Sequence, residues 1–236
     1  MDPIRAILVF VATLFFVLAP VLSGGFGGFD AGAFPVPQAD PPAQPAGWAF
    51  AIWGVIYLWL MISAGIGLFQ RARDPVWEPA RLPLFLSLGP GAAWLRVAGE
   101  SPVAATVLIF WMLAMALIAH VRTPAADRWW LAAPVALYAG WLSGAAWVSL
   151  AVVLAGHGVL GGATAAVLAL AGALATGLAV MARRPAPEYA LALAWAFVGI
   201  AAGNLPGAVL LAGLSALAAL VLLWRGWQAI EKGAQT

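Results

Sequence analysis

The chain has 236 residues, of which 64% are hydrophobic and 8% charged, against roughly 45–50% and 25% in ordinary soluble domains. This composition excludes a water-soluble globule, and the absence of cysteine excludes disulfides, thiolate metal sites and cysteine nucleophiles. The formal net charge of +2, from 11 basic and 9 acidic residues, is too small for a nucleic-acid-binding surface, so no nucleic-acid partner is expected.

Uncharged runs long enough to cross a bilayer dominate the chain. A hydrocarbon core of about 30 Å requires roughly 20 apolar residues in a helix. Eight such runs are predicted: Ile4–Ser23, Ala46–Phe69, Leu82–Ala98, Pro102–Val121, Trp129–Leu154, Val159–Met181, Tyr189–Gly203 and Leu205–Trp224. The last two are separated by the turn-forming segment 203–207, because a single helix over 189–224 would be about 54 Å long. We therefore expect an all-α polytopic membrane bundle of about eight transmembrane helices.

The basic residues predict the orientation of this bundle. Cytoplasmic loops collect Lys and Arg, and with the N-terminus inside, ten of the eleven basic residues fall on the cytoplasmic side, leaving Arg96 outside. Both termini are therefore predicted to be cytoplasmic, and a bacterial inner membrane is the expected location. The first run also resembles a signal peptide, because Arg5 precedes it, but its length exceeds the usual 7–15 apolar residues, which favours a retained helix.

Two further patterns concern the membrane surface and helix packing. A cytoplasmic aromatic belt is predicted from Trp129, Trp130, Trp224 and Trp227. Small residues four apart, which allow helices to approach closely, occur as the weak signals Gly140/Gly144 and Gly158/Gly162.

The predicted spans contain essentially no ionisable residue that could support chemistry inside the membrane. All nine acidic residues lie in loops or tails, and the two histidines, His120 and His157, flank spans on opposite sides of the membrane. No carboxylate pair, His-Glu motif or Gly-x-Ser-x-Gly elbow is present. Proton coupling and conventional hydrolysis are therefore not expected, and neither a catalytic residue nor a metal site is predicted. The segment 24–28 lacks the Lys-Ser/Thr of a phosphate loop and is interpreted as a flexible loop.

A long outer loop, residues 24–45, leads into an aromatic helix. The loop carries five prolines and two aspartates, and loops of this length are more often functional than plain connections. Trp53 and Tyr57 are four apart and share a helix face, whereas Tyr138 and Trp141 are three apart in the fifth span. The second stripe continues through Gly144, Ala145 and Ser149. Such faces can form a flat apolar slot, and ordinary helix packing is the alternative.

Residues 41–57, Pro-Pro-Ala-Gln-Pro-Ala-Gly-Trp-Ala-Phe-Ala-Ile-Trp-Gly-Val-Ile-Tyr, resemble the Pro-Pro-x-Trp-Val-Phe…Val-Trp-x-x-Leu-Tyr signature of the tryptophan-rich sensory proteins, the translocator-protein family (TspO, peripheral benzodiazepine receptor). Residues 138–142 are similar to the Tyr-x-x-Trp-Leu of that family's fifth helix. The family core has five helices. The resemblance therefore implies a TspO-like core over residues 1–156, with the outer loop 24–45, followed by three additional helices and a short cytoplasmic tail over 157–236.

The resemblance also implies a ligand site between the helices, under the first loop. The matching positions are Trp48, Phe50, Trp53, Tyr57, Trp94, Tyr138, Trp141 and, as a polar contact, Ser149. The implied ligand is flat and apolar, similar to a tetrapyrrole or a sterol, so a porphyrin or haem-type molecule is the one candidate cofactor. Arg96 is expected to hold the lid through Asp30, Asp40 or Glu100, or to bind a ligand carboxylate; a solvated surface arginine is the alternative.

These observations predict a small-molecule-binding sensory or regulatory membrane protein rather than an enzyme. Tryptophan-assisted porphyrin photodegradation is implied by the resemblance alone. A structural subunit or assembly factor of a larger membrane complex is the first alternative, and a facilitative lipid or pigment carrier is the second. The expected partners are the bilayer, a small apolar ligand, and a second copy or a larger membrane complex. The last three helices are expected to pack beside the five-helix core without lining its pocket.

Overall fold

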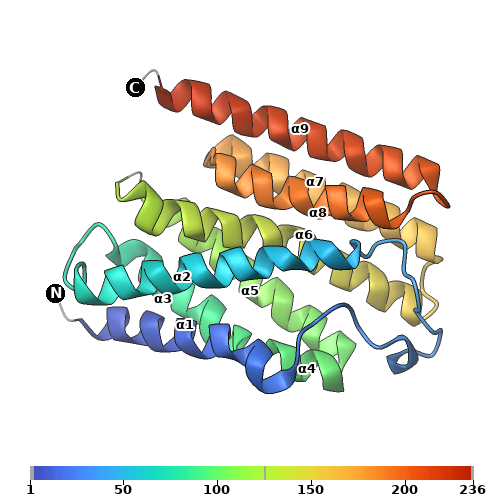
Figure 1. The fold of residues 1–236 in the computed structure, drawn as a ribbon, viewed down its shortest axis with the longest axis horizontal. Coiled ribbons are helices and arrows are strands. Elements are labelled where there is room, and N and C mark those ends of the chain that lie inside the picture. Colours follow the sequence, from blue (N-terminus) through green and yellow to red (C-terminus); the bar gives the residue numbers. More distant parts are fainter. Residues whose placement is uncertain (1–2, 125, 235–236) are drawn as a thin grey trace.

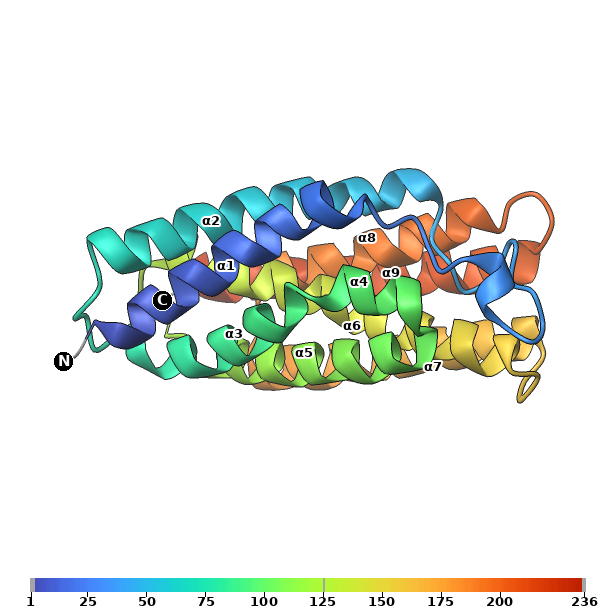
Figure 2. The same cartoon turned by 90° about the horizontal axis from the view of Figure 1, so that it is seen from below.

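The computed structural model describes residues 3–124 and 126–234, and no strand occurs in that part of the chain. Its helical elements are α1 Ile4–Ser23, η1 Ala31–Ala33, η2 Gly47–Ala51, α2 Ile52–Phe69, α3 Glu78–Gly91, α4 Trp94–Glu100, α5 Pro102–Arg122, η3 Arg128–Ala132, α6 Ala133–Gly156, α7 Gly162–Arg183, α8 Pro187–Gly203 and α9 Val209–Ala234. The long helices run up and down along one axis, as Figures 1 and 2 show. The predicted all-α polytopic bundle is confirmed.

Within the described part of the chain, six helical segments are long and apolar enough to cross a membrane. They are Ile4–Ser23, Gly47–Phe69, Pro102–Arg122, Arg128–Gly156, Gly162–Arg183 and Val209–Glu231. A seventh, α8, is apolar but has only 17 residues. The predicted turn after Gly203 is found between α8 and α9, although α9 begins at Val209, four residues later than the predicted span.

The third predicted span, Leu82–Ala98, is wrong as a single helix, because the chain forms α3 and α4 instead. Pro90 has no backbone N–H, and the N–H of Ala92 is shared between the carbonyl oxygens of Leu88 and Gly89. These contacts close a tight turn before Trp94 and end α3. The run is apolar on both sides of this proline, so hydropathy alone predicts one continuous helix.

Helix α6 lies in the middle of the bundle, in contact with α2, α5, α7 and α8. It is buried around most of its circumference, as expected for a helix that is apolar on all sides. Gly140 lies against the backbone carbonyl of Tyr189 in α8, where a Cβ atom would overlap, and a Cβ at Gly144 would lie 2.9 Å from the Cβ of Ala196. This predicted small-residue pair is therefore the place where α6 and α8 approach closely.

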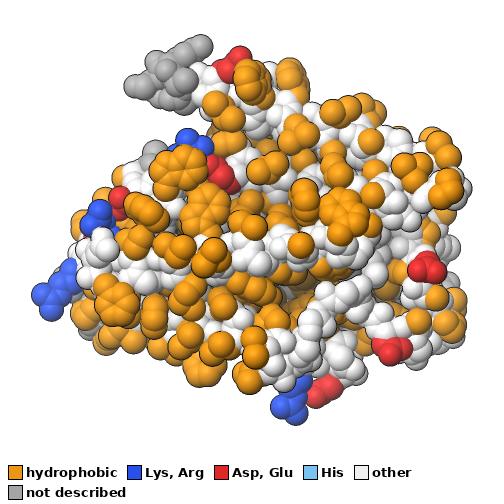
Figure 3. Space-filling model, viewed as in Figure 1, with side chains coloured by type: hydrophobic (Ala, Val, Ile, Leu, Met, Phe, Trp, Pro, Cys, Tyr) orange, Lys and Arg blue, Asp and Glu red, His pale blue; other side chains and the backbone are white. Residues whose placement is uncertain are grey.

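Most of the basic side chains visible in Figure 3 lie at the end of the bundle where both termini also lie (Figures 1 and 3). Apolar side chains cover most of the face shown in Figure 3. The connections and helix ends there carry nearly all the arginines, whereas Arg96 lies in α4; the Lys232 side chain is outside the described part. The four tryptophans of the predicted belt, Trp129, Trp130, Trp224 and Trp227, are 46–60% exposed. This asymmetry is what the orientation prediction requires.

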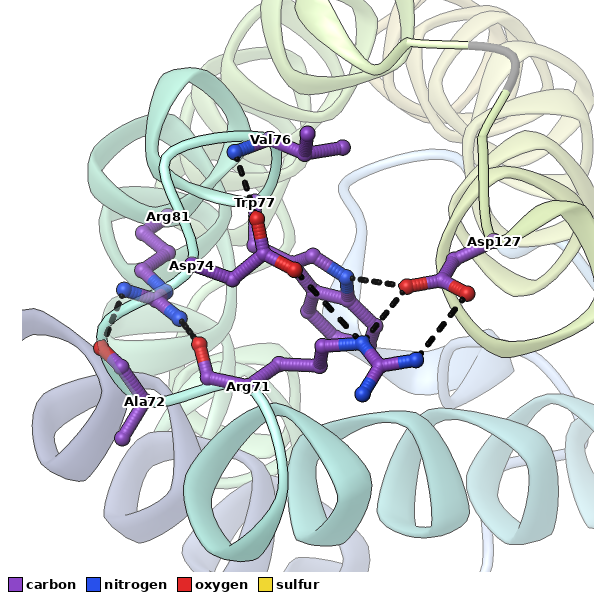
Figure 4. A network of polar contacts seen from close by, with 7 residues as sticks. All are labelled: Arg71, Ala72, Asp74, Val76, Trp77, Arg81 and Asp127. Carbon is purple, nitrogen blue, oxygen red and sulfur yellow. Dashed lines mark hydrogen bonds and ion pairs between the residues drawn. The ribbon is translucent and has the colours of Figure 1, made fainter.

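A polar network at this end joins the α2–α3 connection to the start of η3 (Figure 4). The carboxylate of Asp127 accepts hydrogen bonds from Arg71 Nε and Trp77 Nε1, both at 2.9 Å. The Arg71 hydrogen bond, followed by that of Trp77, lowers the pKa of Asp127, and the pKa of Arg71 is raised in turn. The buried Arg81 donates to backbone carbonyls of the same connection and pairs with Glu78 at 2.9 Å. The network fixes the connection against the bundle.

Candidate ligand-binding site

The outer loop, residues 24–45, is folded over the end of the bundle opposite the termini (Figure 1). Phe34 is buried against Gly156 at the end of α6, where no Cβ atom would fit, and Val36 N–H donates to the Gly156 carbonyl at 2.8 Å. Nearer its start, the ring of Phe26 packs edge-on against Trp94, with 4.8 Å between ring centroids. The Gly-rich segment 24–28, interpreted from the sequence as a flexible loop, thus carries an aromatic side chain that packs into the bundle.

The predicted glycine pair Gly158/Gly162 does not lie in a helix–helix contact. Gly158 adopts a positive φ of 70° in the turn that follows α6. A Cβ at Gly162 would lie 3.4 Å from Pro42 of the outer loop, within ordinary packing distance. Gly158 therefore belongs to the connection between α6 and α7, and Gly162 is the first residue of α7, beneath the loop.

Two adjoining cavities lie under the loop. The first, about 50 Å³, is lined by Phe26, Gly28, Phe29, Gln44, Pro45, Phe50, Trp53, Trp94, Ile109, Trp141, Gly144, Ala145, Val148, Ser149, Val152 and Ala196. The second, about 180 Å³, is lined by Phe16, Ala19, Pro20, Gly25, Phe26, Phe50, Trp53, Tyr57, Gly91, Trp94, Leu95, Ile109, Met112 and Leu142. The side chains common to both linings are Phe26, Phe50, Trp53, Trp94 and Ile109. We call the two together the aromatic cavity.

Six of the eight predicted pocket residues line the aromatic cavity: Phe50, Trp53, Tyr57, Trp94, Trp141 and Ser149. The rings of Trp53 and Tyr57 stack at 5.2 Å with an interplanar angle of 19°. Trp141 approaches Trp53 edge-on, at 6.1 Å and 85°. The two helical stripes recognised in the sequence, on α2 and α6, therefore meet across this space.

The other two predicted pocket residues line neither cavity. Trp48 lies in the 3-10 turn η2 and is half exposed, with its ring edge-on to Trp195 of α8 at 5.0 Å. Tyr138 is fully buried below the cavity, where its hydroxyl lies 2.9 Å from Ser87 Oγ. The family resemblance placed Trp48 in the pocket with Phe50, but in the 3-10 turn η2, with three residues per turn, Trp48 lies against α8 instead.

Arg96 lies away from the cavity. Its side chain is 81% exposed and pairs with Glu100, four residues later in the same helix, at 3.1 Å. Of the partners predicted for it, the pair with Glu100 is present, but Arg96 is in neither lining. Arg96 is therefore a solvated surface arginine, which was the alternative interpretation of the sequence.

Several lining residues were not predicted from the sequence. Phe26 and Phe29 come from the Gly-rich loop, where two aromatic residues among glycines are a usable signal for a segment that packs inward. Ala196 comes from α8, so the expectation that the last three helices stay clear of the pocket is not met by this helix. An alanine carries no such signal, because alanine occurs throughout these helices.

The aromatic cavity is electrically neutral. No Asp, Glu, Lys, Arg or His is among its lining residues. Two of its polar groups bond within the protein: Ser149 Oγ lies 2.6 Å from Thr106 Oγ1, and Trp94 Nε1 donates to the Ala105 carbonyl at 2.9 Å. Among the described residues no cluster of three metal-ligating side chains occurs. The site is suited to an apolar molecule held by ring contacts and burial.

Comparison with known proteins places the chain in a family. The family model described as TSPO-like protein matches residues 6–226, which includes α7, α8 and most of α9. No curated protein and no solved structure gives a significant match. With its apolar spans and this match over nearly its whole length, the chain is an integral membrane protein that belongs to the TSPO-like protein family.

Proposed function

We propose that this protein binds a flat, apolar small molecule of the sterol or tetrapyrrole class in the aromatic cavity, and acts as a sensory or regulatory protein of the membrane. The observation that carries the proposal is the common wall of the two cavities, which is formed by Phe26, Phe50, Trp53 and Trp94. These rings come from the outer loop, η2, α2 and α4. Aromatic residues from four separate segments converge around open volume, whereas rings that only fill packing gaps would leave none.

The ring geometry supports a planar ligand. The stacked pair Trp53 and Tyr57 presents a flat wall, and Trp141 stands perpendicular to it. A planar apolar molecule lying along this wall gains stacking as well as burial, together about 1–3 kcal/mol for each large ring it contacts. Small residues opposite, Gly144 and Ala145, leave room for it.

The outer loop supports access from the side of the membrane opposite the termini. Gly24, Gly25 and Gly27 have no heavy atom within 4 Å of where a Cβ would lie, so this stretch is loosely surrounded. Gln44 Nε2 holds it by one hydrogen bond to the Gly27 carbonyl at 3.0 Å. We propose a bacterial inner membrane as the location, with both termini in the cytoplasm and the loop as a lid on the outer side.

Binding to lipid nanodiscs that contain the purified protein tests the proposal, with empty nanodiscs subtracted. The probes are cholesterol, protoporphyrin IX and the three-ring hydrocarbon fluorene. Saturable binding of at least one probe is expected. Ala145→Trp fills the cavity and should weaken that binding at least tenfold, whereas Ala171→Trp, at an exposed position of α7, should not change it. Absence of saturable binding for all three probes, or equal loss in both variants, would contradict the proposed function.

A further inference from the structure

The wall of the aromatic cavity contains a fully buried hydrogen-bond donor that has no partner. Trp141 is 2% exposed and lines the cavity, and its Nε1 is a buried donor without a hydrogen bond. Among the described residues one other buried side-chain nitrogen or oxygen lacks a partner, His120 Nδ1, and His120 lines neither cavity. Buried donors in folded proteins are almost always paired, so an unpaired one beside open volume indicates a group that a ligand completes.

The surroundings of Trp141 do not satisfy this donor. Its ring neighbours are Phe50 and Trp53, both about 6.1 Å away and nearly perpendicular. A contact between an N–H and an aromatic face is a second-order interaction. A water molecule held here would need two to four polar partners. Three polar side chains of the linings, Ser149, Trp94 and Gln44, already bond to Thr106, Ala105 and Gly27.

The same wall disfavours charge. Neither lining contains an ionisable acidic or basic side chain, and Arg96, the cation expected near the ligand, is on the surface and paired with Glu100. Moving a carboxylate into such a place costs its hydration without supplying a counter-charge. A ligand that enters fully must therefore be neutral.

We infer that the ligand is a neutral, flat, apolar molecule with a hydrogen-bond acceptor, such as a carbonyl, ether or hydroxyl oxygen, and that this acceptor binds Trp141 Nε1. The inference rests on the proposed function and narrows its ligand class. A plain hydrocarbon would leave the donor unpaired, and a porphyrin dicarboxylate would bring charge into a neutral cavity. Neutral molecules with an acceptor are therefore expected to bind more tightly than either.

Matched three-ring probes test the inference in nanodiscs. Fluorenone carries a ketone, whereas 9-methylenefluorene has the same outline without an acceptor. The wild-type protein should bind fluorenone about tenfold more tightly, which corresponds to about 1.4 kcal/mol, the size of one net hydrogen bond. Trp141→Phe keeps a ring but removes the donor, so it should reduce this preference to about one. Fluorenone-4-carboxylate should bind wild type at least tenfold more weakly than fluorenone.

Trp94→Phe is the matched control, because Trp94 lines the same cavity but its donor already bonds to the Ala105 carbonyl. This variant should weaken both neutral probes equally and leave the tenfold preference intact. A preference that survives Trp141→Phe, or one lost in Trp53→Phe instead, would overturn the assignment to Trp141. The wild-type comparison stands even if a variant fails to fold.

The outcomes separate this inference from the proposed function. Equal binding of fluorenone and 9-methylenefluorene to wild type would overturn the inference and leave a flat-ligand site standing. Undiminished binding of the carboxylate would overturn the neutral-ligand part. If no three-ring probe binds saturably, the inference fails for lack of binding, and the sterol and porphyrin titrations then decide the proposed function.

Discussion

Asn204, in the turn between α8 and α9, donates a hydrogen bond from Nδ2 to the carbonyl oxygen of Pro42 at 2.8 Å, across 162 residues of sequence. The same nitrogen lies 2.9 Å from the Ile200 carbonyl at the end of α8. Close by, Ala46 N–H donates to the Gly199 carbonyl at 2.9 Å. The C-terminal helices therefore hold the outer loop and the segment that leads into η2 and α2, in addition to packing beside the preceding helices.

Asn204→Asp should loosen this attachment. The carboxylate keeps the shape of the amide but has no donor, so the Pro42 and Ile200 carbonyls lose their shared partner and face a negative charge instead. We expect a loss of about 1–3 kcal/mol in stability and faster proteolytic cleavage within residues 24–45. Thermal unfolding and limited proteolysis in nanodiscs measure the two effects. Asn204→Asp with unchanged cleavage would show that the loop is held elsewhere.

A second prediction concerns the contact between α6 and α8. Gly140→Ala places a methyl group where the Tyr189 backbone carbonyl lies, and a backbone atom cannot move without separating the helices. We expect a lower unfolding temperature and a loss of about 1–3 kcal/mol from overpacking. Gly65→Ala in α2 is the control, because a Cβ there meets no atom within 4 Å. That variant should be neutral or slightly stabilising, and equal effects in both would contradict the close contact.

The spans could be predicted from sequence because the bilayer sets the length of an apolar run. The predictions for α1, α5 and α7 therefore lie within a few residues of the helices found. Hydropathy does not detect a break inside an apolar run, and this is why the segment that contains Pro90 was predicted as one helix instead of α3 and α4. Boundaries at turns, such as the start of α9, depend on contacts of the turn with other segments.

The residues of the candidate site also divide into those that the sequence could predict and those that it could not. Trp53 and Trp141 were predicted because spacing along helices and a family resemblance both point to them, and Trp94 was predicted from the resemblance. Phe26 was not predicted, since its position depends on how the outer loop folds onto Trp94, 68 residues later in the sequence. Ala196 was not, because only the close approach of α8 to α6 brings it to the cavity.

Trp53 should contribute more to ligand binding than Trp195. Trp53→Ala removes a ring from both cavities, and we expect binding to weaken by about 1–3 kcal/mol, whereas Trp53→Phe should keep most of the affinity. Trp195 donates to the Ala49 carbonyl at 2.8 Å and lines neither cavity. Trp195→Ala should therefore change affinity less than about threefold, under 1 kcal/mol. Comparable losses in Trp53→Ala and Trp195→Ala would place the ligand between the core and α8.

The orientation prediction can be checked without a ligand. Reporter fusions after residue 236 and within the loop 24–45 should report opposite sides of the membrane, because the C-terminal end of α9 and the loop lie at opposite ends of the bundle (Figure 1). A periplasmic phosphatase should be active in the loop fusion, and a cytoplasmic fluorescent protein should be fluorescent at the C-terminus. The same side for both would contradict a bundle with an even number of spans.

The last prediction concerns pH and the carboxylate of Asp127. Hydrogen bonds from Arg71 and Trp77 lower the pKa of this group, so the folded protein releases its proton more readily than the unfolded chain. The resulting stabilisation is fully present above the unfolded pKa, about 3.9, and is lost as the pH falls through the lower, folded pKa. Wild type should therefore unfold at a higher temperature than Asp127→Asn at pH 7, and the difference should shrink toward pH 3.

Asn is the informative replacement, because Asp127 has a positive φ of 52° and Asn tolerates that backbone conformation. Its side-chain oxygen can still accept from Trp77, so the variant removes the charge opposite Arg71 and little else. Arg71→Gln removes the other member of the pair and should flatten the same part of the profile, whereas Arg96→Gln, which affects an exposed pair on the opposite side, should not. A difference between wild type and Asp127→Asn that stays constant from pH 7 to pH 3 would show that the carboxylate stabilises the fold by packing rather than by its charge.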